Sequence, residues 1–306
     1  MPAYLCRRAL VAVPTLFLVS IVTFVALRAI PGNPVEILAG PSASAEAVAA
    51  AKARYGLDRP IITQYVVWAS AALRGDWGTA FVTQTPLVRL LPQRFKNTAA
   101  LAVCGLAFAA LLGVPAGILA AKRRGGLVDL LIMAGVNAGA AMPAFWFGLL
   151  LILAFAIRLR WFPVEGIGGL RAFILPSVTI GFEAAALIAR LTRNGLVEEL
   201  SSDYVRTARS KGLPEGRVLL RHALRNVLIA LATVFGLQLG ALLGGAVFTE
   251  TIFVWPGVGR LIVDAVLQRD YPLVQMGVLL TAATLVIVNI FVDAVYAYLD
   301  PRVQYG

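Results

Sequence analysis

Six runs of apolar residues, almost free of charge, constrain this chain more than any other feature of its sequence. Only one charged residue, Glu183, lies within them, and the runs cover residues 10–26, 99–121, 130–157, 172–189, 227–249 and 273–292. About 20 apolar residues in a helix cross a hydrocarbon core of roughly 30 Å. Lipid cannot hydrogen-bond the backbone, so spans are helices or closed barrels, and barrel strands would alternate in polarity. The sequence therefore predicts an all-α, polytopic membrane protein with six transmembrane helices.

Composition and charge support this prediction and suggest an orientation. Hydrophobic residues make up 59% of the 306 residues and charged residues 14%, against about 45–50% and about 25% in soluble domains. Arg7 and Arg8 precede the first run, and eight Lys and Arg residues lie between the fourth and fifth runs. The positive-inside rule then places both termini and this loop in the cytoplasm. The basic residues sit at span ends without interleaved aromatics, so we do not predict a nucleic-acid partner.

The sequence carries no pattern typical of catalysis or of nucleotide binding. The chain has one histidine, His222, and it lacks the GxxxxGK[ST] signature of a P-loop. Its two cysteines, Cys6 and Cys104, have neither CxxC spacing nor positions suited to a disulfide. We predict a non-catalytic chain that binds no cofactor or metal of its own.

The loop between the fourth and fifth runs is the most specific functional signal. Asp203 is a good N-cap for a helix over residues 204–211, and Gly212 suits the left-handed position that ends a helix. A second basic helix over residues 217–225 then leads into the fifth run. The charges alone could be a topology signal, but orientation does not require a capped helix with a defined stop. We interpret the loop as a structured surface for a soluble partner.

The same loop resembles the cytoplasmic EAA loop of type I ABC-importer permeases. Ala208, Gly212 and Leu224 match the general pattern, and DYVRTARSKGL is similar to the version in the dipeptide/oligopeptide/nickel branch, subunits of the DppB/OppB type. Further segments resemble that branch in the expected order, namely residues 28–34, 55–60, 64–65, 75–78, 250–260, 269–272 and 300–302. The resemblance implies one anchor span plus a five-span importer core with a cytoplasmic coupling helix.

The resemblance also implies a function and a set of partners. The chain would form half of the translocation pathway for short peptides or a related small solute in the bacterial cytoplasmic membrane. A homologous second permease (DppC/OppC type), two ABC ATPases that bind ATP and Mg, and an extracytoplasmic substrate-binding protein would complete the importer. Helix 204–211 would contact an ATPase, through Asp203, Tyr204, Arg206, Thr207, Ala208, Lys211 and Gly212.

Three regions follow from this organisation. Residues 1–29 are an anchor span, residues 30–98 an extracytoplasmic segment, and residues 99–302 the permease domain. Within the outer segment, helices are predicted over residues 43–55 and 61–73, and turns at 31–34 and 75–78. This segment and the loop 251–272 would dock the binding protein, although the segment could instead only cap the bundle. The candidate docking residues are Trp77, Trp255, Arg260 and Asp264.

Polar and small residues inside the runs leave alternatives open. Glu183 could contact solute or carry a proton, or it could form an ion pair with Arg190 or a neighbouring subunit. Glycines recur four apart in three runs, which favours close helix packing. The sets are Gly113 and Gly117, Gly135 and Gly139, and Gly236, Gly240 and Gly244. The set from Gly236 to Gly244 could also line a subunit interface or a solute path. The alternative function is a secondary carrier without an ATPase, for which we expect inverted repeats and several buried ionisable groups.

Overall fold

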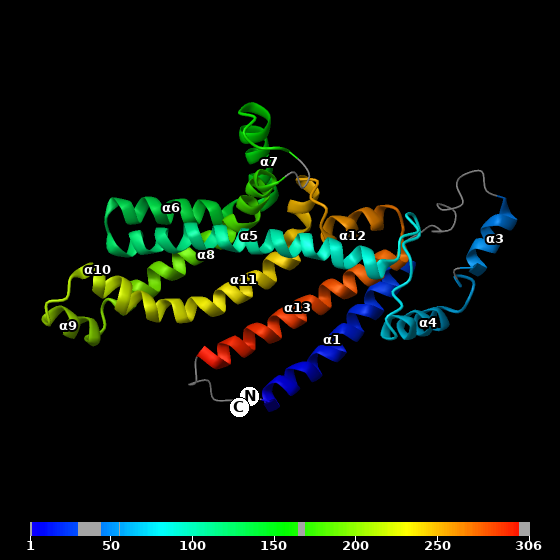
Figure 1. The fold of residues 1–306 in the computed structure, drawn as a ribbon, viewed down its shortest axis with the longest axis horizontal. Helices are drawn as coiled ribbons and strands as arrows, with labels where there is room; N and C mark the ends of the chain where they lie inside the picture. The colour runs from blue at the N-terminus through cyan, green and yellow to red at the C-terminus, as the bar shows by residue number, and fades with distance from the viewer. Residues whose placement is uncertain (1, 30–43, 55, 165–168, 300–306) are drawn as a thin grey trace. The chain divides into compact units, whose positions relative to one another are not determined.

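A computed structural model describes residues 2–29, 44–54, 56–164 and 169–299 (Figure 1). These residues form helices, with one isolated bridge between Thr79 and Pro86 and no longer strand among them. The all-α prediction is therefore confirmed. The helices are α1 Pro2–Ala29, α3 Ala45–Arg54, α4 Ile61–Leu73, α5 Leu87–Lys122, α6 Leu127–Ala141, α7 Ala144–Leu151, η1 Ile152–Arg158, α8 Leu170–Glu199, α9 Asp203–Ser210, α10 Glu215–Arg217, η2 Val218–Ala223, α11 Leu224–Ile252, α12 Val258–Leu267 and α13 Tyr271–Leu299.

Five of the six predicted spans are continuous helices, and the third is not. Within the described residues, the apolar spans are Leu10–Ala29, Leu87–Lys122, Leu170–Glu199, Glu215–Ile252 and Tyr271–Ala294. The run predicted as one helix over residues 130–157 is instead broken after Ala141, and its two halves meet at 105°. Met142 is extended, and Pro143 has no N–H to continue the helix. The structure therefore has five continuous spans, or the predicted six if the bent pair is one span, and the break at Pro143 divides the third run into two helices.

The chain forms two compact units, and each has its own packing. The first unit comprises residues 98–255 and 287 onward. Its central helix is α8. In the most apolar stretch of α8, 67% of the residues are buried, against 17–33% of the residues in the other spans. Gly113 and Gly117 on α5 let that helix approach α8 closely, since an added Cβ would lie 2.5–2.6 Å from the carbonyl oxygens of Ala185 and Ala189. Close helix packing thus accounts for this pair of glycines.

The second unit comprises residues 2–97 and 256–286. Its core includes Leu87 and Leu91 at the start of α5 and Val274 on α13. The Asp270 carboxylate accepts hydrogen bonds from the backbone N–H of Val82 at 3.1 Å and of Leu273 at 3.3 Å. A buried carboxylate therefore fixes the chain at Val82, just before α5, to the start of α13.

The short helices between α1 and α5 match the sequence prediction closely. α4 coincides with the predicted 61–73 helix, and α3 lies within the predicted 43–55 helix. The turn at residues 75–78 has two glycines with positive φ, and Asp76 accepts a hydrogen bond from the N–H of Gly78 at 3.0 Å. The predicted turn at 31–34 and the C-terminal segment 300–302 lie outside the described residues. The three-region division of the chain stays a prediction.

Candidate functional site

Helix α9 begins one residue earlier than the sequence suggested. Ser202 is the N-cap, with extended backbone, and its carbonyl accepts the N–H of Arg206 at 3.3 Å. Asp203 is therefore the first helical residue instead of the cap. A carboxylate in the first turn still favours the helix, because it faces the positive end of the helix dipole.

The end of α9 is closed by a glycine motif, as predicted. Gly212 has φ 74°, in the left-handed region. Its N–H donates to the carbonyl of Arg209 at 2.9 Å, and the N–H of Leu213 donates to that of Ala208 at 3.3 Å. These two bonds define the Schellman motif, which satisfies carbonyls that a helix end leaves open. The stop is thus set by a residue for which positive φ carries no steric cost.

One face of α9 is buried in a small apolar cluster. Val205 is fully buried and Ala208 nearly so, and both pack against Val218 on η2. Leu200 and Leu213, on either side of α9, cover the cluster. Helix α9 therefore packs against the first residue of η2, the π-helix that precedes α11.

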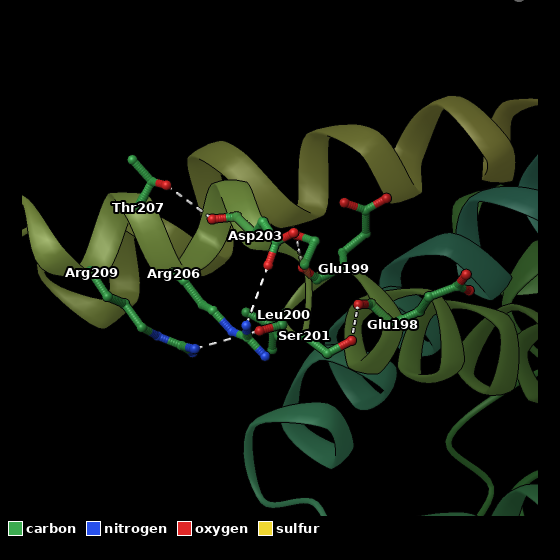
Figure 2. A network of polar contacts seen from close by, with 9 residues as sticks. Glu198, Glu199, Leu200, Ser201, Asp203, Arg206, Thr207 and Arg209 are labelled. Atoms are coloured by element: carbon green, nitrogen blue, oxygen red, sulfur yellow. Dashed lines mark hydrogen bonds and ion pairs between the residues drawn. The ribbon is translucent and has the colours of Figure 1, made fainter.

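The opposite face of α9 is polar, and Figure 2 shows the side chains of Asp203, Arg206, Thr207 and Arg209. The Arg206 side chain is 77% exposed and pairs with Asp203 at 3.3 Å. Thr207 and Lys211 are also exposed. An exposed pair of this kind adds little stability, so these side chains are available to a partner.

Two polar contacts that the sequence did not reveal hold α9 to its neighbours. In the first, Arg209 binds Glu215 at the start of α10, with Nε–Oε1 at 2.6 Å and Nη2–Oε2 at 3.2 Å, and its Nη1 donates to the Leu200 carbonyl at 3.4 Å. The hydrogen bond to Glu215 raises the pKa of Arg209 above its ordinary value. The only local signal for this pair is an acidic residue directly after Pro214.

In the second contact, Tyr204 donates its hydroxyl hydrogen bond to the Glu199 carboxylate at the end of α8. Asn226 on α11 donates from Nδ2 to Glu199 Oε2 at 3.1 Å and to Tyr204 Oη at 3.2 Å. Burial, and then the bond to Glu199, raise the pKa of Tyr204. Three elements, α8, α9 and α11, therefore meet at one hydrogen-bonded network.

Glu183 lines an open cavity of about 270 Å³ in the first unit, formed by α6, α7, α8 and α11. Arg190 and Gln238 line the same cavity. Among the described residues, no ion pair within 4.0 Å joins Glu183 to Arg190, and the Glu183 side chain is exposed. A carboxylate exposed on a spanning helix needs water, solute or another subunit beside it.

The glycines of α11 have different surroundings. An added Cβ at Gly236 would lie 2.5 Å from Val292 on α13, which is helix packing. At Gly240 the nearest atom is Asn289 Oδ1 at 3.6 Å. Gly244 is exposed. The pathway or interface role considered for these three positions stays a prediction.

Two buried carboxylates besides Asp270 were not singled out from the sequence. Glu250, fully buried at the end of α11, accepts a hydrogen bond from Thr98 Oγ1 at 2.5 Å. Asp129 on α6 binds Arg193 on α8 through two oxygens, both at 2.7 Å, and also accepts the N–H of Gly125 at 2.9 Å. Both lie just outside the uncharged runs, where sequence alone does not distinguish a buried carboxylate from an exposed one.

The candidate docking residues differ in exposure. Trp255 is fully buried and meets Phe173 edge to face at 4.6 Å, so its side chain is not at the surface. Trp77 is half-buried on the core of the second unit. Arg260 and Asp264 are partly exposed, with Nε and Oδ2 3.7 Å apart. No group of three or more His, Cys, Asp or Glu side chains able to hold a metal occurs in the part of the chain that the structure describes.

Comparison with known proteins decides the family. Residues 113–305 match the family described as binding-protein-dependent transport system inner membrane component, and residues 1–102 match its N-terminal companion. The chain belongs to this permease family. The permease is 41% identical over 302 residues to the glutathione transport system permease protein GsiC of Escherichia coli K12, covering 99% of each chain. It is 40% identical over the same length to GsiC of Shigella flexneri serotype 5b.

Solved structures agree on the fold of the permease. The inward-facing MetNI methionine ABC transporter matches with a TM-score of 0.60 and 18% identity, over 70% of this chain and 98% of that one. An amino acid ABC transporter matches with a TM-score of 0.54 and 12% identity, over 68% and 94%. The resemblance to the type I importer permeases is thus confirmed. The protein is a multi-pass membrane permease subunit of an ABC importer.

Proposed function

We propose that this permease forms half of the import pathway for short peptides, with glutathione-like peptides as the leading substrate class. The identity of 41% to GsiC over nearly the whole chain supports this class. A homologous second permease of the DppC/OppC type would form the other half. The open cavity beside Glu183 fits a place at which that second chain or the solute completes the surroundings of the carboxylate.

Energy for import would come from ATPase subunits that contact α9. The exposed face bearing Arg206, Thr207 and Lys211 would sit on an ATPase, while the opposite face stays docked on Val218. ATP and Mg would be bound by those subunits. Movement of α9 would then act on the inner ends of α8 and α11 through Glu199 and Asn226.

We also propose a binding protein as the remaining partner and an orientation of the chain in the membrane. An extracytoplasmic binding protein would deliver the peptide to the outer segment, with Arg260 and Asp264 as candidate contacts. Both termini and α9 would lie in the cytoplasm. The single observation that carries the proposal is the structure of α9. Its end is set by a Schellman motif, two polar contacts hold it to neighbouring helices, and its exposed face is basic.

Peptide uptake by the reconstituted importer tests the proposal. We expect Arg206→Gln to reduce ATP-dependent uptake and ATPase co-purification several-fold, because it removes an exposed charge from the contact face. Arg123→Gln, an exposed cation in the turn between α5 and α6, is the matched control and should leave both unchanged. Uptake that proceeds without ATP or any ATPase subunit would instead establish the secondary carrier.

A further inference from the structure

The second unit contains a cavity of about 170 Å³, and none of the residues that line it belongs to α9 or its contacts. It lies where the last turn of α1, helix α4 and the start of α13 meet, and it is lined by Arg28, Arg59, Trp68 and Gln275 among others. A water molecule occupies about 30 Å³ of liquid volume, so the cavity has room for more than one. No Asp or Glu is among its described lining residues.

Two residues that line this cavity carry a buried donor without a hydrogen-bond partner. Trp68 Nε1 and Gln275 Nε2 are both inaccessible and unpaired, and Gln275 as a whole is only 3% exposed. Leaving a buried N–H unsatisfied costs about 1–3 kcal/mol. Two such donors on residues that line one cavity favour an acceptor there, which small side-chain movements would bring into reach.

The charges at the cavity have the same sign. Arg28 is held in place by Gln64 Oε1 at 2.9 Å and the Phe24 carbonyl at 3.2 Å, and its guanidinium lies 3.4 Å from the centre of the Phe24 ring. Within the described residues neither Arg28 nor Arg59 pairs with a carboxylate. A partly buried guanidinium without a counter-ion is costly, so an anionic acceptor fits better than a neutral one.

The position of the cavity identifies the kind of anion. Arg28 lies at the end of the apolar span Leu10–Ala29, which is where lipid headgroups meet a spanning helix. Apolar side chains on both helices beside it are exposed, including Val22 and Val25 on α1 and Ile62 and Val67 on α4. These surfaces suit acyl chains, and Val67 itself lines the cavity.

We propose that this cavity binds the headgroup phosphate of an anionic phospholipid. Trp68 Nε1, Gln275 Nε2 and the two arginines would donate to the phosphate oxygens, and the acyl chains would lie along α1 and α4. A zwitterionic choline headgroup would bring its own cation towards Arg28 and Arg59, so anionic lipid is preferred. The site is independent of the coupling role of α9.

Lipid retention and thermal unfolding of the full-length protein purified from membranes test the site. Phosphatidylglycerol should stay bound in native mass spectrometry and raise the unfolding midpoint more than phosphatidylcholine does. Trp68→Phe, which keeps an aromatic ring and removes the indole N–H, should weaken retention roughly tenfold, as expected for one hydrogen bond to a charged group. Arg59→Gln should act in the same direction.

Two controls make the outcome decisive. Arg74→Gln changes an exposed cation just after α4 that does not line the cavity, and it should retain lipid as the native protein does. Inorganic phosphate added to delipidated protein tests a soluble anion. Protection by phosphate without lipid retention would overturn the lipid assignment. Equal retention of lipid by the native protein, Trp68→Phe and Arg59→Gln would overturn the site altogether and leave water as its occupant.

Discussion

At the scale of single residues, Gly212 makes the sharpest prediction. Its φ of 74° is strained for any side chain, although an added Cβ would meet nothing within 4 Å. A β-branched residue there costs at least about 1–2 kcal/mol in backbone strain, so we expect Gly212→Val to shift the end of α9 and reduce uptake several-fold without blocking membrane insertion. Uptake normalised to the amount of protein in the membrane measures this.

Gly216→Val is the matched control for Gly212→Val. Gly216 lies four residues on in the same loop, has no positive φ, and has open space around it. The same substitution there should leave uptake close to normal. Native uptake by Gly212→Val would show that coupling does not need the glycine stop of α9. Equal losses at both positions would show that uptake is sensitive to any bulky residue in this loop.

Local chemistry explains which residues of the site could be predicted from sequence. Gly212 was found because a helix stop depends on residues next to it in the chain. Glu199 lies only five residues before Tyr204, but their contact depends on how the chain turns between α8 and α9. Asn226 was missed because its partners Glu199 and Tyr204 lie 27 and 22 residues away and come into reach only when α11 packs beside them. Glu250 was missed for the same reason, since Thr98 lies 152 residues away.

At the scale of elements, the two ion pairs of α9 should differ in strength. Both pairs are exposed, but Arg209 joins α9 to α10 through two bonds to Glu215, whereas Arg206 and Asp203 form a single contact within α9. We expect Arg209→Gln to speed hydrogen exchange of the α9 amides by about threefold to tenfold, because it frees the helix from its neighbour. Arg206→Gln should change exchange by less than about twofold. Equal effects would mean that the apolar cluster around Val205 alone holds α9.

At the scale of the whole molecule, apolar runs predicted where helices cross the membrane but not how the third run does so. Periodicity and length are the same for a straight helix and for two shorter helices joined at a bend. Pro143 signals a disturbance, yet the angle of 105° between α6 and the helix that follows depends on their packing against α8. The bent pair is either one crossing or a re-entrant segment, and the two give different topologies.

Labelling from outside the cell distinguishes these two topologies. With six crossings and a cytoplasmic N-terminus, Arg74 lies outside and Ser210 on α9 lies inside. With a re-entrant pair there are five crossings, and both residues lie outside. In a background with Cys6 and Cys104 replaced, we expect an impermeant maleimide to label Arg74→Cys in intact cells and Ser210→Cys only after permeabilisation, since both positions are exposed. Labelling of Ser210→Cys in intact cells would place α9 beyond the reach of any cytoplasmic ATPase.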